Sequence, residues 1–114
     1  MDTRVAPDLS IVVRQAAEAA AAMKAIAHES RLLVLCHLSE AGELSAGELT
    51  RRIGMGQSAL SQHLAKLRAE GLVEVRKEAQ SVFYRIADDR MHRLLHALHD
   101  IYCPALEAGP TTGE

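Results

Sequence analysis

Hydrophobic and polar positions follow two different periods along this chain, and the periods predict its secondary structure. In five segments, apolar side chains recur every three or four residues, which places them on one face of an α-helix. These segments cover residues 10–27, 30–41, 45–53, 57–70 and 88–105. Two short runs, 72–76 and 82–86, alternate apolar and polar residues and predict a β-hairpin connected by residues 77–81. The expected fold is mainly α with a small β-hairpin, in the order α-α-α-α-β-β-α.

The ends of several helical segments carry local stop and start signals. Ser45 is followed three residues later by Glu48, which is the capping-box pattern of a helix N-terminus. Gly54 and Gly71 follow the third and fourth segments, in the place where glycine commonly ends a helix. Asp88 stands at the start of the last segment, where a negative charge complements the helix dipole. The helices are therefore expected to be separate and joined by short turns.

The fourth segment has an unusual polar face. Its sequence between residues 57 and 67 is QSALSQHLAKL, in which Leu60, Leu64 and Leu67 share one side of a helix. The other side carries short polar side chains and one cation: Gln57, Ser58, Ser61, Gln62 and Lys66. Such side chains can approach the edges of bases in a major groove, whereas an acidic side chain would be repelled by phosphate.

A polar helix face by itself is also typical of ordinary solvated helices. Here, however, a short helix, a glycine-containing turn, the polar helix and a hairpin with a basic tip follow one another directly. Two helices joined by such a turn are the pattern of a helix-turn-helix, and the hairpin is placed to act as a wing. The combination favours DNA binding, with the segment at 57–70 as the recognition helix.

Charge is distributed unevenly around this candidate DNA reader. The chain has 114 residues and a formal net charge of −2. Residues 45–86 contain seven Lys and Arg against four Asp and Glu, while the remainder contains six against eleven. A basic middle can approach phosphates even in an acidic protein, because the local field matters more than net charge. The length predicts one domain, at residues 10–106, between a flexible N-terminus at 1–9 and a disordered tail at 107–114.

Several other functional classes find little support in the sequence. No apolar run approaches the length of a membrane span, and the N-terminus lacks the pattern of a signal peptide, so we expect a cytoplasmic protein without membrane contact. A glycine-rich phosphate loop, a nucleophile elbow and a pair of catalytic carboxylates are all absent, which argues against an enzyme. A protein-interaction module without DNA binding stays open as the alternative, and it would not show the steep salt dependence of phosphate binding.

At this level of detail the chain closely resembles the ArsR/SmtB family of bacterial winged-helix repressors. The resemblance covers about residues 20–105, and its most specific part is the pattern SQHLAKLRAEGLV followed by FYRI. It implies a homodimer joined through the first and last helices, with two recognition helices on an inverted repeat of double-stranded DNA. Carried over to this chain, the implied base and phosphate contacts are Gln57, Ser58, Ser61, Gln62, His63 and Lys66, with wing contacts from Arg76, Lys77 and Gln80. Gly56 departs from the family, which often has a capping Ser at this place.

The family also suggests where a signal could be sensed. Many relatives bind soft metals through a Cys-x-Cys pair on the third helix, but this chain has no thiol between residues 45 and 49, which excludes arsenic, lead or cadmium sensing there. Cys36 and Cys103 lie on the second and last helices instead. Cys36 could simply be a small buried hydrophobic residue. The sequence around the two cysteines, however, resembles the persulfide-sensing BigR/SqrR and HlyU-like branch, which implies that a low-molecular-weight persulfide or oxidant links the two thiols and weakens DNA binding.

A row of histidines on the last helix offers an alternative. His92, His96, His99 and Cys103 lie at helical spacing on nearby faces and could hold Zn²⁺, which would make a zinc-responsive repressor. The spacing differs from the Asp-x-His and His-x-x-Glu pattern of zinc-sensing relatives. The histidines could equally be a half-solvated flank of the helix, or His99 could lower the pKa of the Cys103 thiol. We expect no bound cofactor, with zinc as the alternative.

Overall fold

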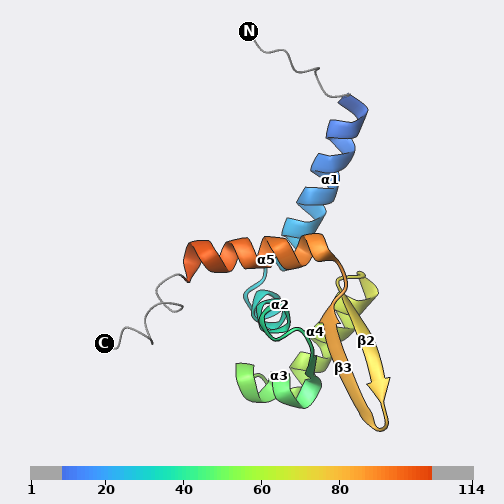
Figure 1. Cartoon of the computed structure of the whole chain (residues 1–114), viewed down its shortest axis with the longest axis vertical. Coiled ribbons are helices and arrows are strands. Elements are labelled where there is room, and N and C mark those ends of the chain that lie inside the picture. The colour runs from blue at the N-terminus through green and yellow to red at the C-terminus, as the bar shows by residue number, and fades with distance from the viewer. Residues whose placement is uncertain (1–8, 104–114) are drawn as a thin grey trace, which may run out of the picture.

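The computed structural model describes residues 9–103, and in this range it shows the helices and hairpin that the sequence predicts (Figure 1). In chain order the elements are α1 Leu9–Ile26, α2 Glu29–Ala41, β1 Leu44–Ser45, α3 Ala46–Ile53, α4 Gln57–Ala69, β2 Val73–Glu78, β3 Ser81–Ile86 and α5 Asp89–Tyr102. Leu9 is already helical, so the first helix begins one residue before its predicted start at residue 10. The rest of the predicted flexible N-terminus, the predicted end of the last helix at residue 105, and the tail at 107–114 lie outside the described residues.

The capping signals in the sequence are confirmed. The Ser45 hydroxyl accepts a hydrogen bond from the Glu48 backbone N–H at 3.2 Å, while the Glu48 carboxylate accepts one from the Ser45 backbone N–H at 3.0 Å. Gly54 and Gly71 adopt the left-handed conformation, with φ of 80° and 78°, which a side chain would disfavour. Asp88 caps α5 by accepting a hydrogen bond from the Arg90 backbone N–H at 2.8 Å. These interactions all join residues close in sequence, which is why the sequence predicts them.

The β-structure is larger than the sequence predicts. The two hairpin strands continue to Glu78 and from Ser81, so only Ala79 and Gln80 form the turn, and Ala79 has a positive φ of 55°. The prediction of a five-residue connection was wrong because polar residues pair in an exposed hairpin as well as apolar ones do. A short third strand, β1, pairs antiparallel with β3 and makes a sheet of order β1-β3-β2. A strand as short as β1, with two residues, has no sequence pattern that predicts it.

Leucines from most elements form the core around α2. The described side chains that are most buried come from α2, α3, α4 and α5: Val34, Leu35, Leu38, Leu49, Leu60, Leu64, Leu67 and Leu95. The three leucines that the pattern of α4 places on one face are all in this set. Their burial fixes the rotation of α4 about its own axis, and therefore which side chains of α4 face solvent.

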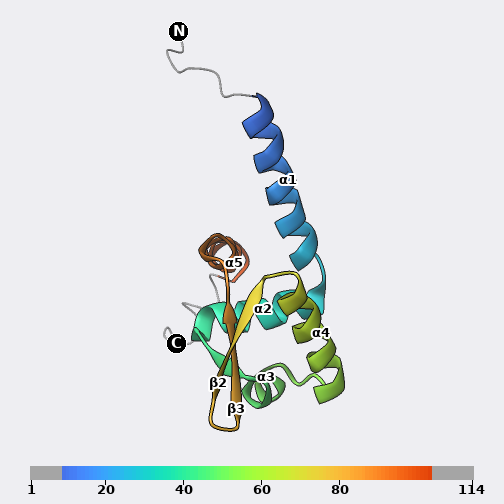
Figure 2. The same ribbon diagram turned by 90° about the vertical axis from the view of Figure 1, so that its right-hand side faces the viewer.

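Helix α1 stands apart from this core. In both views it projects away from the other elements, while α3, α4 and the β2–β3 hairpin lie at the opposite end (Figures 1 and 2). Large apolar side chains on α1 are exposed: Leu9, Ile11, Val12, Val13 and Met23. The end of α5 also exposes two, Ile101 at 66% and Tyr102 at 77%. Such a concentration of exposed apolar groups is uncommon on monomeric soluble proteins.

We predict that Leu64→Ala lowers the free energy of unfolding by about 2–5 kcal/mol, because it removes a fully buried side chain and leaves a cavity. Leu64 is 1% exposed, whereas Ser61 on the same helix is exposed. Ser61→Ala serves as the matched control and is expected to change stability by less than about 0.5 kcal/mol. Urea unfolding followed by circular dichroism at one protein concentration measures both. Equal effects of the two changes would contradict this placement of the core.

Candidate nucleic-acid interface and thiol pair

The polar face of α4 is largely exposed to solvent. Its predicted DNA-contacting side chains, apart from His63, are all exposed: Gln57, Ser58, Ser61, Gln62 and Lys66. They project from the helix side opposite the buried leucines, so the structure places them together on one surface. Gly56 is the N-cap of α4 and has no side-chain capping hydrogen bond, in agreement with the prediction that a capping hydroxyl is missing here.

His63 differs from the other predicted contacts because it is half-buried. Its ring lies against that of His28, with 5.4 Å between the ring centroids. Partial burial lowers the pKa of His63, and the neighbouring His28, Arg31 and Lys66 lower it further, so His63 is uncharged at neutral pH. His28 itself caps α2, since its Nδ1 accepts a hydrogen bond from the Ser30 backbone N–H at 3.2 Å. Histidine is an unusual capping residue, so the sequence pattern predicts neither this cap nor the contact between His28 and His63.

The three predicted DNA-contacting residues of the wing differ in whether their side chains are free to bind DNA. Lys77 and Gln80 are exposed at the end of the β2–β3 hairpin. Arg76 is also on the surface, but its guanidinium is engaged by two carboxylates, at 2.8 Å from Glu43 and 2.8 Å from Glu78. Hydrogen bonds to Glu43 and then Glu78 are the main reasons why the pKa of Arg76 is raised. Lys77 is therefore the wing cation that the structure leaves available.

The two cysteines, far apart in sequence, are brought together. Cys36 lies on α2 and Cys103 is the C-cap of α5, where its backbone N–H donates to the His99 carbonyl at 2.8 Å. Both are free thiols and half-buried. Burial raises the pKa of the Cys36 thiol, and the charge of a Cys103 thiolate raises it further, as does Glu40. This charge effect places the two thiols in the same region of the fold, while their pairing remains what the family resemblance implies.

The histidines of α5 do not converge on one point. His92 Nδ1 lies 2.7 Å from the Ser39 hydroxyl, and His96 Nδ1 lies 3.4 Å from Asp100 on the same helix. Within residues 9–103, no three His, Cys, Asp or Glu side chains form a group that could hold a metal ion. A single chain thus offers no support for the zinc alternative.

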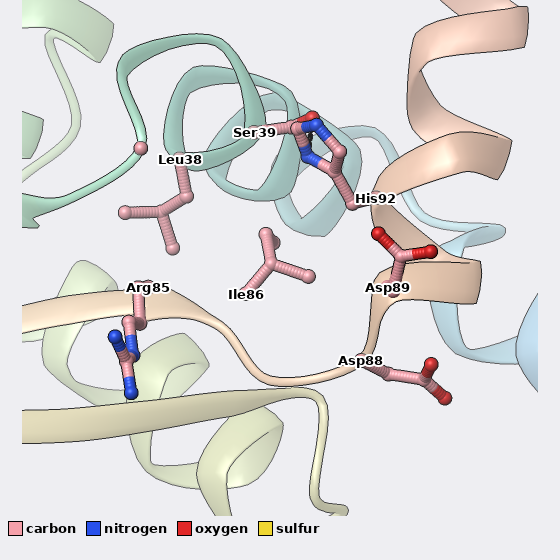
Figure 3. A pocket seen from close by; sticks show the side chains of 8 residues that line it. Leu38, Ser39, Arg85, Ile86, Asp88, Asp89 and His92 are labelled. Carbon is pink, nitrogen blue, oxygen red and sulfur yellow. Dashed lines mark hydrogen bonds between the residues drawn. The ribbon is translucent and has the colours of Figure 1, made fainter.

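The contact of His92 with Ser39 borders a small pocket at the start of α5. Figure 3 shows this pocket, of about 260 Å³, with Ser39 and His92 on one side and Arg85, Asp88 and Asp89 around it. Leu38 and Ile86 form its apolar floor. The contact joins α2 to α5 at the end of α5 opposite Cys103.

Comparison with known proteins identifies the family. Residues 28–75 match the family model described as bacterial regulatory protein, arsR family. The transcriptional activator HlyU of Vibrio cholerae is 47% identical over 98 residues, which cover 86% of this chain and 90% of that protein. The chain belongs to the arsR family. The resemblance inferred from the sequence is thereby confirmed.

Solved structures of arsR-family members share the fold. Reduced HlyU from Vibrio cholerae has a TM-score of 0.75 at 48% identity, covering 81% of this chain and 96% of that one. The transcriptional repressor BigR from Xylella fastidiosa has a TM-score of 0.76 at 39% identity, covering 85% and 95%. The fold is the winged helix, and the protein is a DNA-binding transcriptional regulator rather than an enzyme. No helix among the described residues is long and apolar enough to cross a membrane.

We predict that alkylation of Cys36 has a pH midpoint above the ordinary thiol value of 9.0, because burial and the Cys103 thiolate disfavour its ionised form. In Cys103→Ser the midpoint is expected to fall only in part, since burial is the larger cause. Rates of iodoacetamide modification of Cys36, followed by peptide mass spectrometry from pH 7 to 10, measure both. A midpoint that Cys103→Ser does not move would show that the two thiols do not interact.

Proposed function

We propose that this regulator is a homodimeric repressor whose affinity for an inverted-repeat operator falls when a low-molecular-weight persulfide links Cys36 to Cys103. The observation that carries the proposal is that Cys36 lies on α2 and Cys103 at the end of α5, two helices that pack against each other. Burial, and after it the charge of a Cys103 thiolate, raise the pKa of Cys36. No metal or other cofactor takes part. Among the relatives, the biofilm growth-associated repressor of Agrobacterium fabrum is 42% identical over 95 residues, which favours repression.

Dimerisation is supported by the apolar surface of α1 and α5. A groove of about 1060 Å³ runs between α1, α5 and the turn after α4. Small and apolar side chains contribute much of its lining: Ala19, Ala22, Met23, Leu72, Met91 and Leu94. A second copy would cover these groups together with the exposed apolar residues of α1, and the small alanines allow helices to pack closely. Two α4 helices would then face successive major grooves, as a twofold operator requires.

DNA contact is assigned to α4 and the wing. Gln57, Ser58, Ser61 and Gln62 would lie against base edges, and Lys66 and Lys77 against phosphates, while Gln80 would approach the backbone at the hairpin turn. The partly buried, uncharged His63 would contribute hydrogen bonding without a positive charge. Arg76 can join these contacts only if it leaves Glu43 and Glu78.

The thiol chemistry is a two-electron oxidation with the persulfide as oxidant. One cysteine thiolate attacks the outer sulfur of the persulfide RSSH, which forms Cys–S–SH and releases RSH. The second thiol then attacks the inner sulfur of this cysteine persulfide, closing a Cys36–Cys103 disulfide and releasing H₂S. The raised pKa leaves little Cys36 thiolate at neutral pH, so we assign the first attack to Cys103 and the second to Cys36. A further equivalent of persulfide would insert one more sulfur and release a second RSH.

The link would act on DNA binding through α2. This helix packs against α5, which belongs to the proposed dimer interface, and against α3, which precedes the recognition helix. A covalent bond between α2 and the end of α5 would fix the position of α5, and with it the separation of the two α4 helices. One relative was solved specifically as reduced HlyU, which supports a role for the redox state in this branch of the family.

We predict that persulfide treatment weakens operator binding about 5- to 150-fold, the usual range for coupling between two sites. The measurement is fluorescence anisotropy with the upstream promoter DNA, using reduced protein, protein treated with glutathione persulfide, and reduced protein with Zn²⁺. Cys36→Ser and Cys103→Ser should abolish the effect. Cys36→Ser should accumulate a persulfide on Cys103, visible by mass spectrometry. Release by Zn²⁺ without any persulfide effect would instead support the alternative site at His92, His96, His99 and Cys103.

We also predict that Gln62→Ala combined with Lys66→Ala weakens operator binding, and that the slope of log K against log salt falls by about 0.9 for the lost phosphate contact. Arg93→Gln is the control for loss of one cation, because Arg93 lies on α5 and is 72% exposed. The same anisotropy titration at several salt concentrations measures the slope. An unchanged affinity in the double variant would favour a protein-interaction module.

A further inference from the structure

Each of the three guanidinium nitrogens of Arg76 donates a hydrogen bond in the free protein. Its Nε and Nη2 donate to the two carboxylate oxygens of Glu43 at 2.9 and 2.8 Å, and its Nη1 donates to Glu78 at 2.8 Å. The contact with Glu43 is therefore bidentate, with two parallel N–H···O bonds. This is also the geometry in which arginine binds a phosphate group.

The position of this cluster connects two parts of the fold. Arg76 lies on β2, and its cross-strand partner on β3 is Phe83, whose ring centroid lies 4.8 Å below the guanidinium. Glu43 directly precedes β1 at the other edge of the sheet, because the strand order is β1-β3-β2. The side chain of Arg76 therefore crosses the sheet surface over Phe83 to reach the connection between α2 and α3.

The ion pair is accessible enough to exchange partners. The side chain of Arg76 is 45% exposed and that of Glu43 is 30% exposed. Ion pairs at such surfaces contribute little net free energy, because both groups are well solvated when apart. A phosphate oxygen could thus replace the carboxylate at small cost. The hydrogen bonds from Arg76 lower the pKa of Glu43, which keeps its negative charge in place at every pH where DNA binding is measured.

We infer that Glu43 is an affinity-setting residue, which holds Arg76 in the free protein and competes for it with a phosphate of the operator backbone. The inference rests on the proposed contact between the wing and DNA. In the complex Arg76 turns from Glu43 to the phosphate while remaining over Phe83, and the freed Glu43 carboxylate opposes the nearby phosphates. Glu43 therefore lowers operator affinity and suppresses the salt dependence that Arg76 would otherwise add.

The test uses the full-length protein and operator DNA in anisotropy titrations over a range of salt concentrations. Glu43→Gln is expected to tighten binding about two- to fivefold, the scale of one surface ion pair. It should also steepen the slope of log K against log salt by up to about 0.9, because no freed carboxylate then takes up cations that offset the counterions released from the phosphate. Thermal unfolding followed by circular dichroism checks that each variant is folded.

Two further variants separate competition for Arg76 from a general charge effect. In the Arg76→Gln background, Glu43→Gln should no longer tighten binding, since the gain passes through Arg76. Glu74→Gln is the matched control, because Glu74 is also on β2 and pairs at 3.0 Å with a different arginine, Arg85. Its effect on affinity should be smaller than that of Glu43→Gln.

The outcomes distinguish this inference from the proposed function on which it rests. If Arg76→Gln weakens binding but Glu43→Gln leaves it unchanged or weaker, Arg76 contacts DNA and Glu43 does not compete for it. If Glu43→Gln still tightens operator binding in the Arg76→Gln background, or if Glu74→Gln tightens it equally, the cause is the loss of a negative charge near DNA. The inference is then wrong. If Arg76→Gln does not change operator affinity, Arg76 does not contact DNA. In that case both the proposed wing contact of Arg76 and the competition by Glu43 are wrong.

Discussion

The burial of apolar side chains around α2 is the constraint on which the rest of this structure depends. Val34, Leu35 and Leu38 are completely buried, and helices α3, α4 and α5 each contribute leucines to the same cluster. Because these leucines must face α2, the opposite side of α4 must face solvent, and its serines and glutamines become available to DNA. The surface that reads DNA is in this sense a consequence of the core. A small domain has few such leucines, so each one matters to the orientation of a whole helix.

The same helix also carries the groups that could report a signal. Cys36 and Ser39 lie on α2, and both are only half-buried. Ser39 contacts His92 of α5, and the charge of Cys103 at the end of α5 adds to burial in raising the pKa of Cys36. Helix α2 thus stands between the proposed dimer surface and the DNA-reading helices. A chemical change at Cys36 needs no long pathway to affect DNA binding, because the element that carries it already packs against both.

Charge in this regulator is controlled by local pairing more than by composition. The basic middle of the sequence suggests a general attraction to phosphate, but Arg76 and Arg85 on the wing are both neutralised by glutamates. Lys66 and Lys77 are exposed cations beside the proposed groove contacts. Pairing with acids therefore changes which arginines are available to phosphate, and a count of charges does not reveal it.

The sequence by itself determined the helices, the capping box at Ser45, the glycine ends at Gly54 and Gly71, and the helix-turn-helix with its hairpin. Each of these depends on residues a few positions apart, so a periodic pattern or a short motif carries the information. The recognisable sequence from residue 28 onward also determined the family, and with it the candidate DNA-contacting residues and the candidate thiol pair.

Only the tertiary structure decided the contacts between distant residues. The pairing of β1 with β3, the capping of α2 by His28 beside His63, and the hold of Glu43 on Arg76 across 33 positions have no local signature. The pairing of Cys36 and Cys103 was implied by the family, and in the folded chain the charge of Cys103 adds to burial in raising the pKa of Cys36. Such contacts depend on how the helices and the sheet pack, and packing is set by the whole core at once rather than by any one stretch of sequence.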